Sequence, residues 1–246
     1  MPIQIEWLGQ SGYRIVFSDG PTVCIDPYLS HAMMGGRTRE RLLPVPIAAW
    51  ELGADLVITT HDHGDHFDEV TLRPIAESPR TTFVGPTSCR EHWRAMGLPV
   101  ERFLRLDQGE SLEIAGIRLT ATYARHRSGA TEDAVGIVLE GSSVRIYHVG
   151  DSEYTPALVA DVADLRPDLL LVPINGRAGN MDAAQAAQLV ADVRPRLAIP
   201  MHYGVIPNNT ADPQDFVDAC RAAGVDARVA LLKVGVRFAL APEDRE

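Results

Sequence analysis

The chain has 246 residues, of which 46% are hydrophobic and 23% are charged, an ordinary composition for a globular protein with a full core. Its formal net charge of −10 argues against a nucleic-acid partner, because phosphates require a basic surface. No apolar run is long enough to span a membrane, and the three cysteines are too widely spaced for a disulfide framework or a zinc ribbon. The first residues lack the pattern of a signal peptide, so we expect a cytoplasmic protein.

Short apolar segments separated by turn residues predict that the chain begins with β-structure. The expected strands are residues 3–8, 13–17 and 22–26. A loop over residues 27–46 follows, and its length marks it as functional or mobile. Strands and helices then alternate: helix 47–52, strand 56–60, helix 67–76, strand 82–84 and helix 88–96.

The second half of the chain repeats this order. The expected strands are 103–106, 111–114, 117–123, 135–140 and 144–149. The alternating elements after them are helix 156–163, strand 169–173, helix 183–193, strand 197–200, helix 213–223 and strands 227–231 and 236–239. Two such halves predict an α/β fold of two mixed sheets packed face to face with helices outside, an αββα sandwich. No linker divides the chain, so residues 1–246 are expected to form one domain.

A histidine-rich loop follows the apolar strand pattern at residues 55–60. It reads His-Asp-His-Gly-Asp-His over residues 61–66. Open α/β sheets place active sites at the carboxyl ends of their strands, and imidazole and carboxylate groups are the usual ligands of zinc, iron and manganese. The loop therefore indicates a catalytic metal site. The alternative is a polar loop whose histidines only form hydrogen bonds.

Three later residues have metal-binding side chains just beyond the carboxyl ends of expected strands. They are His126, Asp151 and His202. Each alone is compatible with an ordinary role: a loop histidine, a helix N-cap or a histidine at a strand end. Together with the histidine loop they favour convergence at one edge of the sandwich.

The ordered series of these residues, which begins with Asp26, resembles the motif set of the metallo-β-lactamase superfamily over nearly the whole chain. That resemblance implies the αββα sandwich and a centre with two divalent cations, zinc or manganese foremost and iron as an open alternative. It implies that the first cation binds His61, His63 and His126, the second binds Asp65, His66 and His202, and Asp151 bridges the two. Asp26 would lie behind them and fix the imidazole tautomers.

Two cations about 3.5–4 Å apart bind a bridging hydroxide and lower its pKa, and one of them can polarise the oxygen of a substrate. In that arrangement Asp151 would hold the metals together. Asp65 would orient the hydroxide and later carry a proton. The implied activity is hydrolysis by a metal-bound hydroxide.

Residues 7–12, 25–30, 147–152 and 199–202 resemble the ascorbate-6-phosphate lactonase-like branch of the superfamily. That branch implies hydrolysis of a cyclic ester on a sugar phosphate. His126 departs from the lactonase pattern and favours two metals here.

Several side chains near the expected site loops are candidates for contact with substrate. Tyr154 follows Asp151 by three residues and would hydrogen-bond the substrate carbonyl or the leaving oxygen; the alternative is an aromatic side chain packed on the core. Guanidinium groups bind phosphate in bidentate fashion. The other candidates for substrate contact are Arg125, Arg127, Arg177 and Asn175, together with the arginines of the 27–46 loop. His148 is left outside the metal shell as a supporting or core residue.

The leading hypothesis is a lactonase that acts on a small, phosphorylated, sugar-like substrate. The first alternative is a phosphodiesterase or other phosphoester hydrolase with the same two-metal chemistry. The second alternative is a non-catalytic binding or regulatory scaffold. The expected partner is a small molecule, without nucleic acid or membrane; the sequence leaves a homo-oligomer open.

Overall fold

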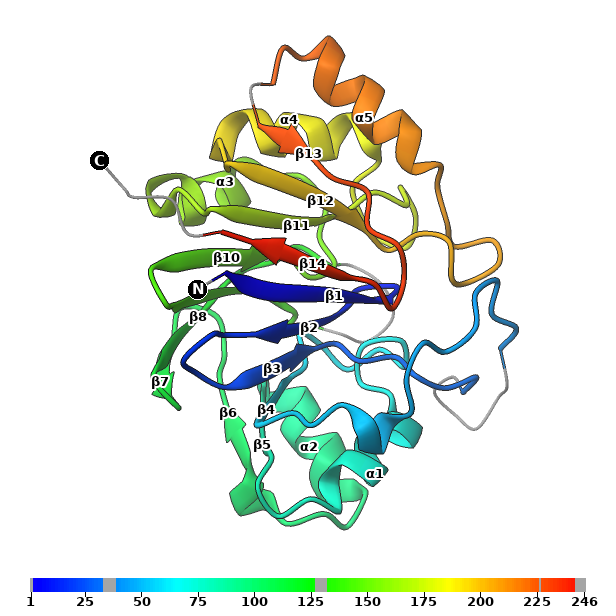
Figure 1. The fold of residues 1–246 in the computed structure, drawn as a ribbon, viewed down its shortest axis with the longest axis vertical. Helices are drawn as coiled ribbons and strands as arrows, with labels where there is room; N and C mark the ends of the chain where they lie inside the picture. Colours follow the sequence, from blue (N-terminus) through cyan, green and yellow to red (C-terminus); the bar gives the residue numbers. More distant parts are fainter. Residues whose placement is uncertain (1, 33–38, 127–131, 226, 242–246) are drawn as a thin grey trace.

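Two β-sheets of seven strands each lie face to face in the computed structural model, which describes residues 2–32, 39–126, 132–225 and 227–241 (Figure 1). The first sheet has the order β14 (Arg237–Leu240), β1 (Ile3–Gly9), β2 (Gly12–Val16), β3 (Thr22–Ile25), β4 (Leu56–Ile58), β5 (Thr82–Gly85), β6 (Phe103–Arg105). The second has the order β13 (Arg228–Val229), β12 (Leu197–Met201), β11 (Leu169–Pro173), β10 (Val144–His148), β9 (Val135–Gly141), β8 (Ile117–Tyr123), β7 (Ser111–Ile114).

Helices lie on the outer side of each sheet, which confirms the predicted αββα sandwich (Figure 1). Helices α1 (Glu69–Ala76) and α2 (Thr87–Ala95) lie outside the first sheet, and α3 (Pro156–Val162), α4 (Ala183–Val193) and α5 (Pro213–Ala222) lie outside the second. None of the helices in the described ranges is long and apolar enough to cross a membrane.

The core lies between the sheets, where apolar side chains of both inner faces meet. Ile5 and Ile15 of the first sheet belong to the same buried cluster as Ile137 and Leu171 of the second. A separate cluster between the first sheet and its helices contains Trp93 of α2. Each sheet therefore buries its apolar side chains against another layer, which is the main source of stability in such a fold.

Parallel strand pairing brings distant loops to one edge of the sandwich. Strands β3, β4, β5 and β6 are parallel neighbours, and so are β10, β11 and β12. The histidine loop follows β4, while Asp151 and His202 follow β10 and β12. The carboxyl ends of both parallel sets thus supply the polar residues of one site.

Most predicted boundaries agree with the structure to within two residues, but the helix expected at 47–52 is wrong. This segment contains only a single 3-10 turn, η1 (Ala49–Glu51). Pro46 stands before the segment, and Gly53 after it has a left-handed backbone with φ of 58°, so there is no room for a full helix. The closing strand β14 also joins the first sheet by pairing antiparallel with β1, a long-range contact that local patterns do not predict.

The described ends of the 27–46 loop are packed against the segment that follows His202. Tyr28 forms a buried cluster with Val205 and Ile206, and the backbone N–H of Leu42 donates to the Val205 carbonyl at 2.8 Å. The Arg41 guanidinium lies over the Tyr28 ring, 4.8 Å from its centroid. Residues 33–38, which include Arg37, lie outside the described ranges.

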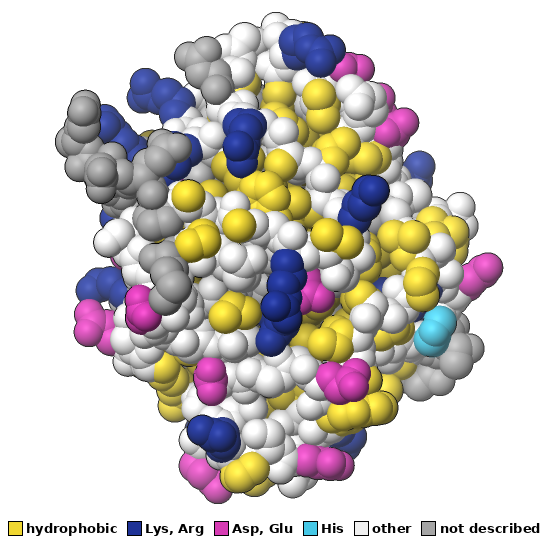
Figure 2. Space-filling view, in the orientation of Figure 1, with side chains coloured by type: hydrophobic (Ala, Val, Ile, Leu, Met, Phe, Trp, Pro, Cys, Tyr) yellow, Lys and Arg dark blue, Asp and Glu magenta, His cyan; other side chains and the backbone are white. Residues whose placement is uncertain are grey.

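Charged side chains are scattered over the face of the molecule seen in Figure 2. Acidic and basic groups are interspersed there with apolar ones and form no continuous basic surface on that face. This distribution agrees with the net charge of −10. It offers no platform on that face for the phosphates of a nucleic acid.

We expect Leu171→Ala to destabilise the protein by about 2–5 kcal/mol, because it opens a cavity in a central strand between the sheets. The Leu171 side chain is fully buried in β11. Urea unfolding followed by circular dichroism measures the change. Val236→Ala is the control: its side chain is 53% exposed, and a surface change of this kind alters stability by less than about 0.5 kcal/mol. Equal losses in the two variants would contradict the assignment of this core.

Candidate metal centre

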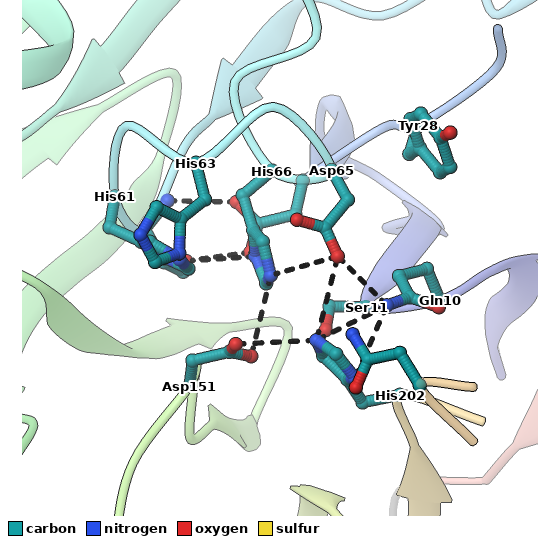
Figure 3. A network of polar contacts seen from close by, with 12 residues as sticks. Gln10, Ser11, Tyr28, His61, His63, Asp65, His66, Asp151 and His202 are labelled. Atoms are coloured by element: carbon teal, nitrogen blue, oxygen red, sulfur yellow. Dashed lines mark hydrogen bonds and ion pairs between the residues drawn. The ribbon is translucent and has the colours of Figure 1, made fainter. Parts of the chain in front are cut away.

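The histidine loop is a tight turn that directs several polar side chains toward the edge of the sandwich (Figure 3). The backbone N–H groups of His66 and Phe67 both donate to the His63 carbonyl, at 2.9 and 2.7 Å. The side chains of His61 and His66 are fully buried. This turn therefore brings together the potential ligands His61, His63, Asp65 and His66.

One group of three ring nitrogens is formed by His61, His63 and His126. The Nδ1 atom of His63 lies 3.0 Å from Nε2 of His61 and 3.1 Å from Nε2 of His126. His126 reaches this position from the segment after β8. The three nitrogens lie within 4.8 Å of one another, a spacing that lets them share one cation.

A second group is formed by Asp65, His66 and His202. The Oδ2 atom of Asp65 lies 3.6 Å from Nε2 of His202 and 4.0 Å from Nε2 of His66. These atoms also fall within 4.8 Å of one another. This group joins the histidine loop of the first sheet to the end of β12 in the second sheet.

Asp151 lies between the two groups and faces both (Figure 3). Its Oδ1 atom is 3.3 Å from Nε2 of His66, and its Oδ2 atom is 3.2 Å from Nε2 of His202. The same Oδ2 is 3.9 Å from Nε2 of His126 in the first group. One carboxylate is therefore placed to contact cations in both groups.

The donors present fit a transition metal. Nε2 of His66 and Oδ1 of Asp151 are buried and face each other at 3.3 Å, with no further hydrogen-bond partner in the part of the chain that the structure describes. Burial of polar atoms with so few partners is unfavourable, and a cation would supply the missing contacts. Imidazole nitrogen with carboxylate oxygen is the donor set that zinc, manganese and iron share in proteins.

Asp26 lies behind the cluster and orients His66. Its Oδ2 atom accepts from Nδ1 of His66 at 2.7 Å and from the Thr60 hydroxyl at 2.7 Å, while its Oδ1 accepts from the Thr60 N–H at 2.8 Å. A proton on Nδ1 leaves the lone pair of Nε2 directed into the cluster. This is the arrangement that the expected supporting role of Asp26 requires.

The electrostatics of the cluster keep the carboxylates ionised. Burial alone would raise the pKa of Asp151, but the imidazoles of His202 and His66 hold it well below its ordinary value. Asp65 has the same opposing influences, and its pKa is also lowered. Burial, joined by the neighbouring His66, lowers the pKa of His61 well below its ordinary value, so that this ring is neutral and free to bind a metal.

The pKa values of His66 and His202 are shifted in the opposite direction. Burial, the largest single influence, disfavours their charged forms, but the neighbouring carboxylates together outweigh it and raise the pKa of both rings: Asp151 with Asp26 and Asp65 at His66, and Asp151 with Asp65 at His202. Metal binding at this group therefore displaces protons.

Gln10 was not identified from the sequence as a residue of the cluster, whereas His148 was expected to be a supporting or core residue. Gln10 is buried, and its Nε2 atom donates to Oδ2 of Asp65 at 2.8 Å. Nε2 of His148 donates to the Ser11 carbonyl at 2.9 Å, and Nδ1 of His148 accepts from the Gly150 N–H at 3.1 Å. Gln10 and Ser11 belong to the quoted segment 7–12, but only the fold shows that this turn reaches the cluster.

The contacts of Tyr154 do not favour the catalytic role predicted for it. Its hydroxyl donates to Oδ2 of Asp192 at 2.6 Å, and Asp192 lies on α4. This hydrogen bond raises the pKa of the Tyr154 hydroxyl. The residue therefore ties the segment after β10 to a helix of the outer layer.

The other substrate candidates have varied surroundings. Arg125 pairs with Glu153 at 3.2 Å, and Arg177 is exposed. Asn175 is buried and donates to Oδ1 of Asn209 at 2.7 Å. Arg127 lies outside the described residues.

Comparison with known proteins agrees with this geometry. The model of the family described as the Beta-lactamase superfamily domain matches residues 22–203. A UPF0173 metal-dependent hydrolase of Methanopyrus kandleri is 30% identical over 244 residues, covering 96% of this chain and 99% of the relative. Another, from Hyperthermus butylicus, is 33% identical over 235 residues, covering 94% of this chain and 96% of the relative.

The solved structure of Igni18, a metallo hydrolase of Ignicoccus hospitalis, has the same fold, with a TM-score of 0.75 and 22% identity over 98% of this chain and 99% of that one. The resemblance inferred from the ligand series is confirmed, and the chain belongs to the metallo-β-lactamase superfamily.

Proposed function

We propose that this chain, a metal-dependent hydrolase of the superfamily, holds two divalent cations in the cluster. The proposed ligands are His61, His63 and His126 for one cation, Asp65, His66 and His202 for the other, and Asp151 for both. The position of Asp151 carries the proposal, since its two oxygens face ring nitrogens of both groups at 3.2–3.9 Å.

Divalent cations in such a centre lower the pKa of bound water and polarise a carbonyl or phosphoryl oxygen of the substrate. Asp65 is the carboxylate that water and substrate meet first, because its side chain is 19% exposed whereas that of Asp151 is 4% exposed. Its lowered pKa keeps it ionised, so that it can accept a hydrogen bond from bound water and orient it. Asp151 holds the two groups at a fixed separation, and Asp26 keeps His66 in one orientation.

The nature of the donors guides the choice of metal. Five imidazoles and two carboxylates make up the proposed set, and the predominance of nitrogen favours zinc. The carboxylates also suit manganese, and iron is compatible with the same ligands.

The proposed reaction is hydrolysis of a lactone on a small, phosphorylated, sugar-like substrate in the cytoplasm. The four segments that resemble the lactonase-like branch support this specificity, and three of them, 7–12, 147–152 and 199–202, contain cluster residues Gln10, Asp151 and His202. A phosphodiesterase is the second candidate, because two cations can stabilise both the attacking and the leaving oxygen of a phosphoryl transfer.

We expect purified protein to bind two equivalents of transition metal and Asp151→Ala to lower kcat/KM about a thousandfold, because loss of the shared carboxylate removes several kcal/mol of transition-state stabilisation. Metal analysis and initial rates measure the two effects. Asp164→Ala, at an exposed position on η3 (Ala163–Leu165), is the control and should retain both metal and activity. Less than one bound equivalent in the unmodified protein would contradict the proposed centre.

A substrate panel tests the specificity. We expect lactones of phosphorylated sugar acids to be hydrolysed with kcat/KM more than about tenfold above that for bis(p-nitrophenyl) phosphate, because pocket contacts that fit one substrate raise its rate over others. A pH indicator follows ring opening, and released nitrophenol follows the diester. The reverse ranking would favour the phosphodiesterase. Absence of hydrolysis across both classes by metal-loaded protein would favour the non-catalytic scaffold.

Tyr154→Phe separates a structural from a catalytic tyrosine. The hydroxyl is already bonded to Asp192, so we expect kcat to fall less than about tenfold, below the effect of about 10²–10⁴ that a general acid supplies. Rates with the best substrate of the panel measure the change. A drop beyond a hundredfold with intact metal content would instead restore Tyr154 to the reacting groups.

A further inference from the structure

Gln10 occupies the turn between β1 and β2 with an unusual backbone. Its φ is 52°, in the left-handed region, which is unfavourable for a residue with a Cβ atom. Two hydrogen bonds hold it there, since its carbonyl accepts from the His202 N–H and from the Trp7 indole N–H, each at 3.0 Å. The strained turn is thus fixed directly to the backbone of a proposed metal ligand.

The side chain of Gln10 contacts the second ligand group (Figure 3). Its Nε2 donates at 2.8 Å to Oδ2 of Asp65, the oxygen that faces the rings of His66 and His202. The same Nε2 lies 3.2 Å from each of the two ring nitrogens of His202. Gln10 therefore contacts two of the three residues in this group through its amide.

The chemistry of the amide defines what this contact does. A flipped amide would place Oε1 against an ionised carboxylate, so the –NH₂ end must face Asp65. The lone pair of the amide nitrogen is delocalised into the carbonyl group, so this nitrogen does not bind a cation and the –NH₂ end acts through the residues that it contacts, Asp65 and His202. In the described part of the chain, the polar contacts of the Gln10 side chain are with Asp65 and His202, both in the second group.

We propose that Gln10 is a positioning residue for the second cation: it fixes Oδ2 of Asp65 and the backbone of His202, and so strengthens binding at Asp65, His66 and His202 but not at the first group. This inference rests on the proposed two-cation centre. Partners that orient metal ligands in this way typically change affinity about 10- to 100-fold.

Gln10→Met removes the donor and keeps an unbranched side chain of similar length. Zn²⁺ titration of the metal-free full chain against a chromophoric chelator gives the dissociation constant of each bound cation. We expect one constant to rise about 10- to 100-fold, while the other stays within about twofold. Gln214→Met is the matched control: Gln214 also donates its amide to a carboxylate, Asp218 at 3.0 Å, but on the exposed face of α5.

A second variant separates the amide contact from folding. Gln10→Gly removes the side chain and relieves the cost of the left-handed backbone, so the fold is retained. It should show the same selective weakening as Gln10→Met, with an unchanged circular dichroism spectrum. Full affinity for both cations in Gln10→Gly would overturn the assignment.

A double-mutant cycle shows whether Gln10 acts through Asp65. In an Asp65→Ala background, where only the first group is intact, Gln10→Met should leave the affinity of the surviving cation within about twofold. Weakening of both cations by the same factor, in either background, would overturn the proposal. If the unmodified protein binds two cations and Gln10→Met binds both with the same affinities, only this inference is contradicted. If the unmodified protein binds no cation, the metal centre itself is contradicted.

Discussion

The constraint on which the rest of this structure depends is the burial of metal-binding side chains that have few polar partners besides one another. Nε2 of His66 and Oδ1 of Asp151 lie inside the molecule 3.3 Å apart, with no further hydrogen-bond partner in the described part of the chain. Buried polar atoms of this kind are destabilising unless another group binds them. A cation supplies that group, so the fold and the metal are expected to stabilise each other.

The two sheets contribute to the centre in different ways. The first sheet supplies the histidine loop after β4, and the second supplies Asp151 and His202 after two of its parallel strands. Neither sheet alone carries a complete group around Asp151. The turn at Gln10 and Ser11 connects them, since it bonds Asp65 on one side and both His202 and His148 on the other. The site is therefore complete only where the two sheets are packed together.

Local sequence patterns predicted the features of the fold that depend on residues close together in the sequence. Hydrophobic periodicity found β8, β11 and α4 with the same bounds as the structure, and the position of polar residues after strands found the cluster. These local patterns did not predict contacts between residues far apart in the sequence: Gln10 lies 55 positions from Asp65 and 192 from His202. The Tyr154 hydrogen bond to α4 was missed for the same reason, because only tertiary packing decides which partner a hydroxyl finds.

Left-handed backbone at three non-glycine residues shows how the fold holds the centre in place. Gln10, Asp26 and His202 have φ of 52°, 43° and 63°, and all three contact or belong to the second ligand group. Each such residue costs about 1–3 kcal/mol, and such conformations persist only where surrounding contacts determine them. Here those contacts are hydrogen bonds from the backbone of His202 to Gln10 and from Thr60 and His66 to Asp26. The strain is thus offset by the network that aims the ligand atoms, which leaves less conformational entropy to lose when a cation binds.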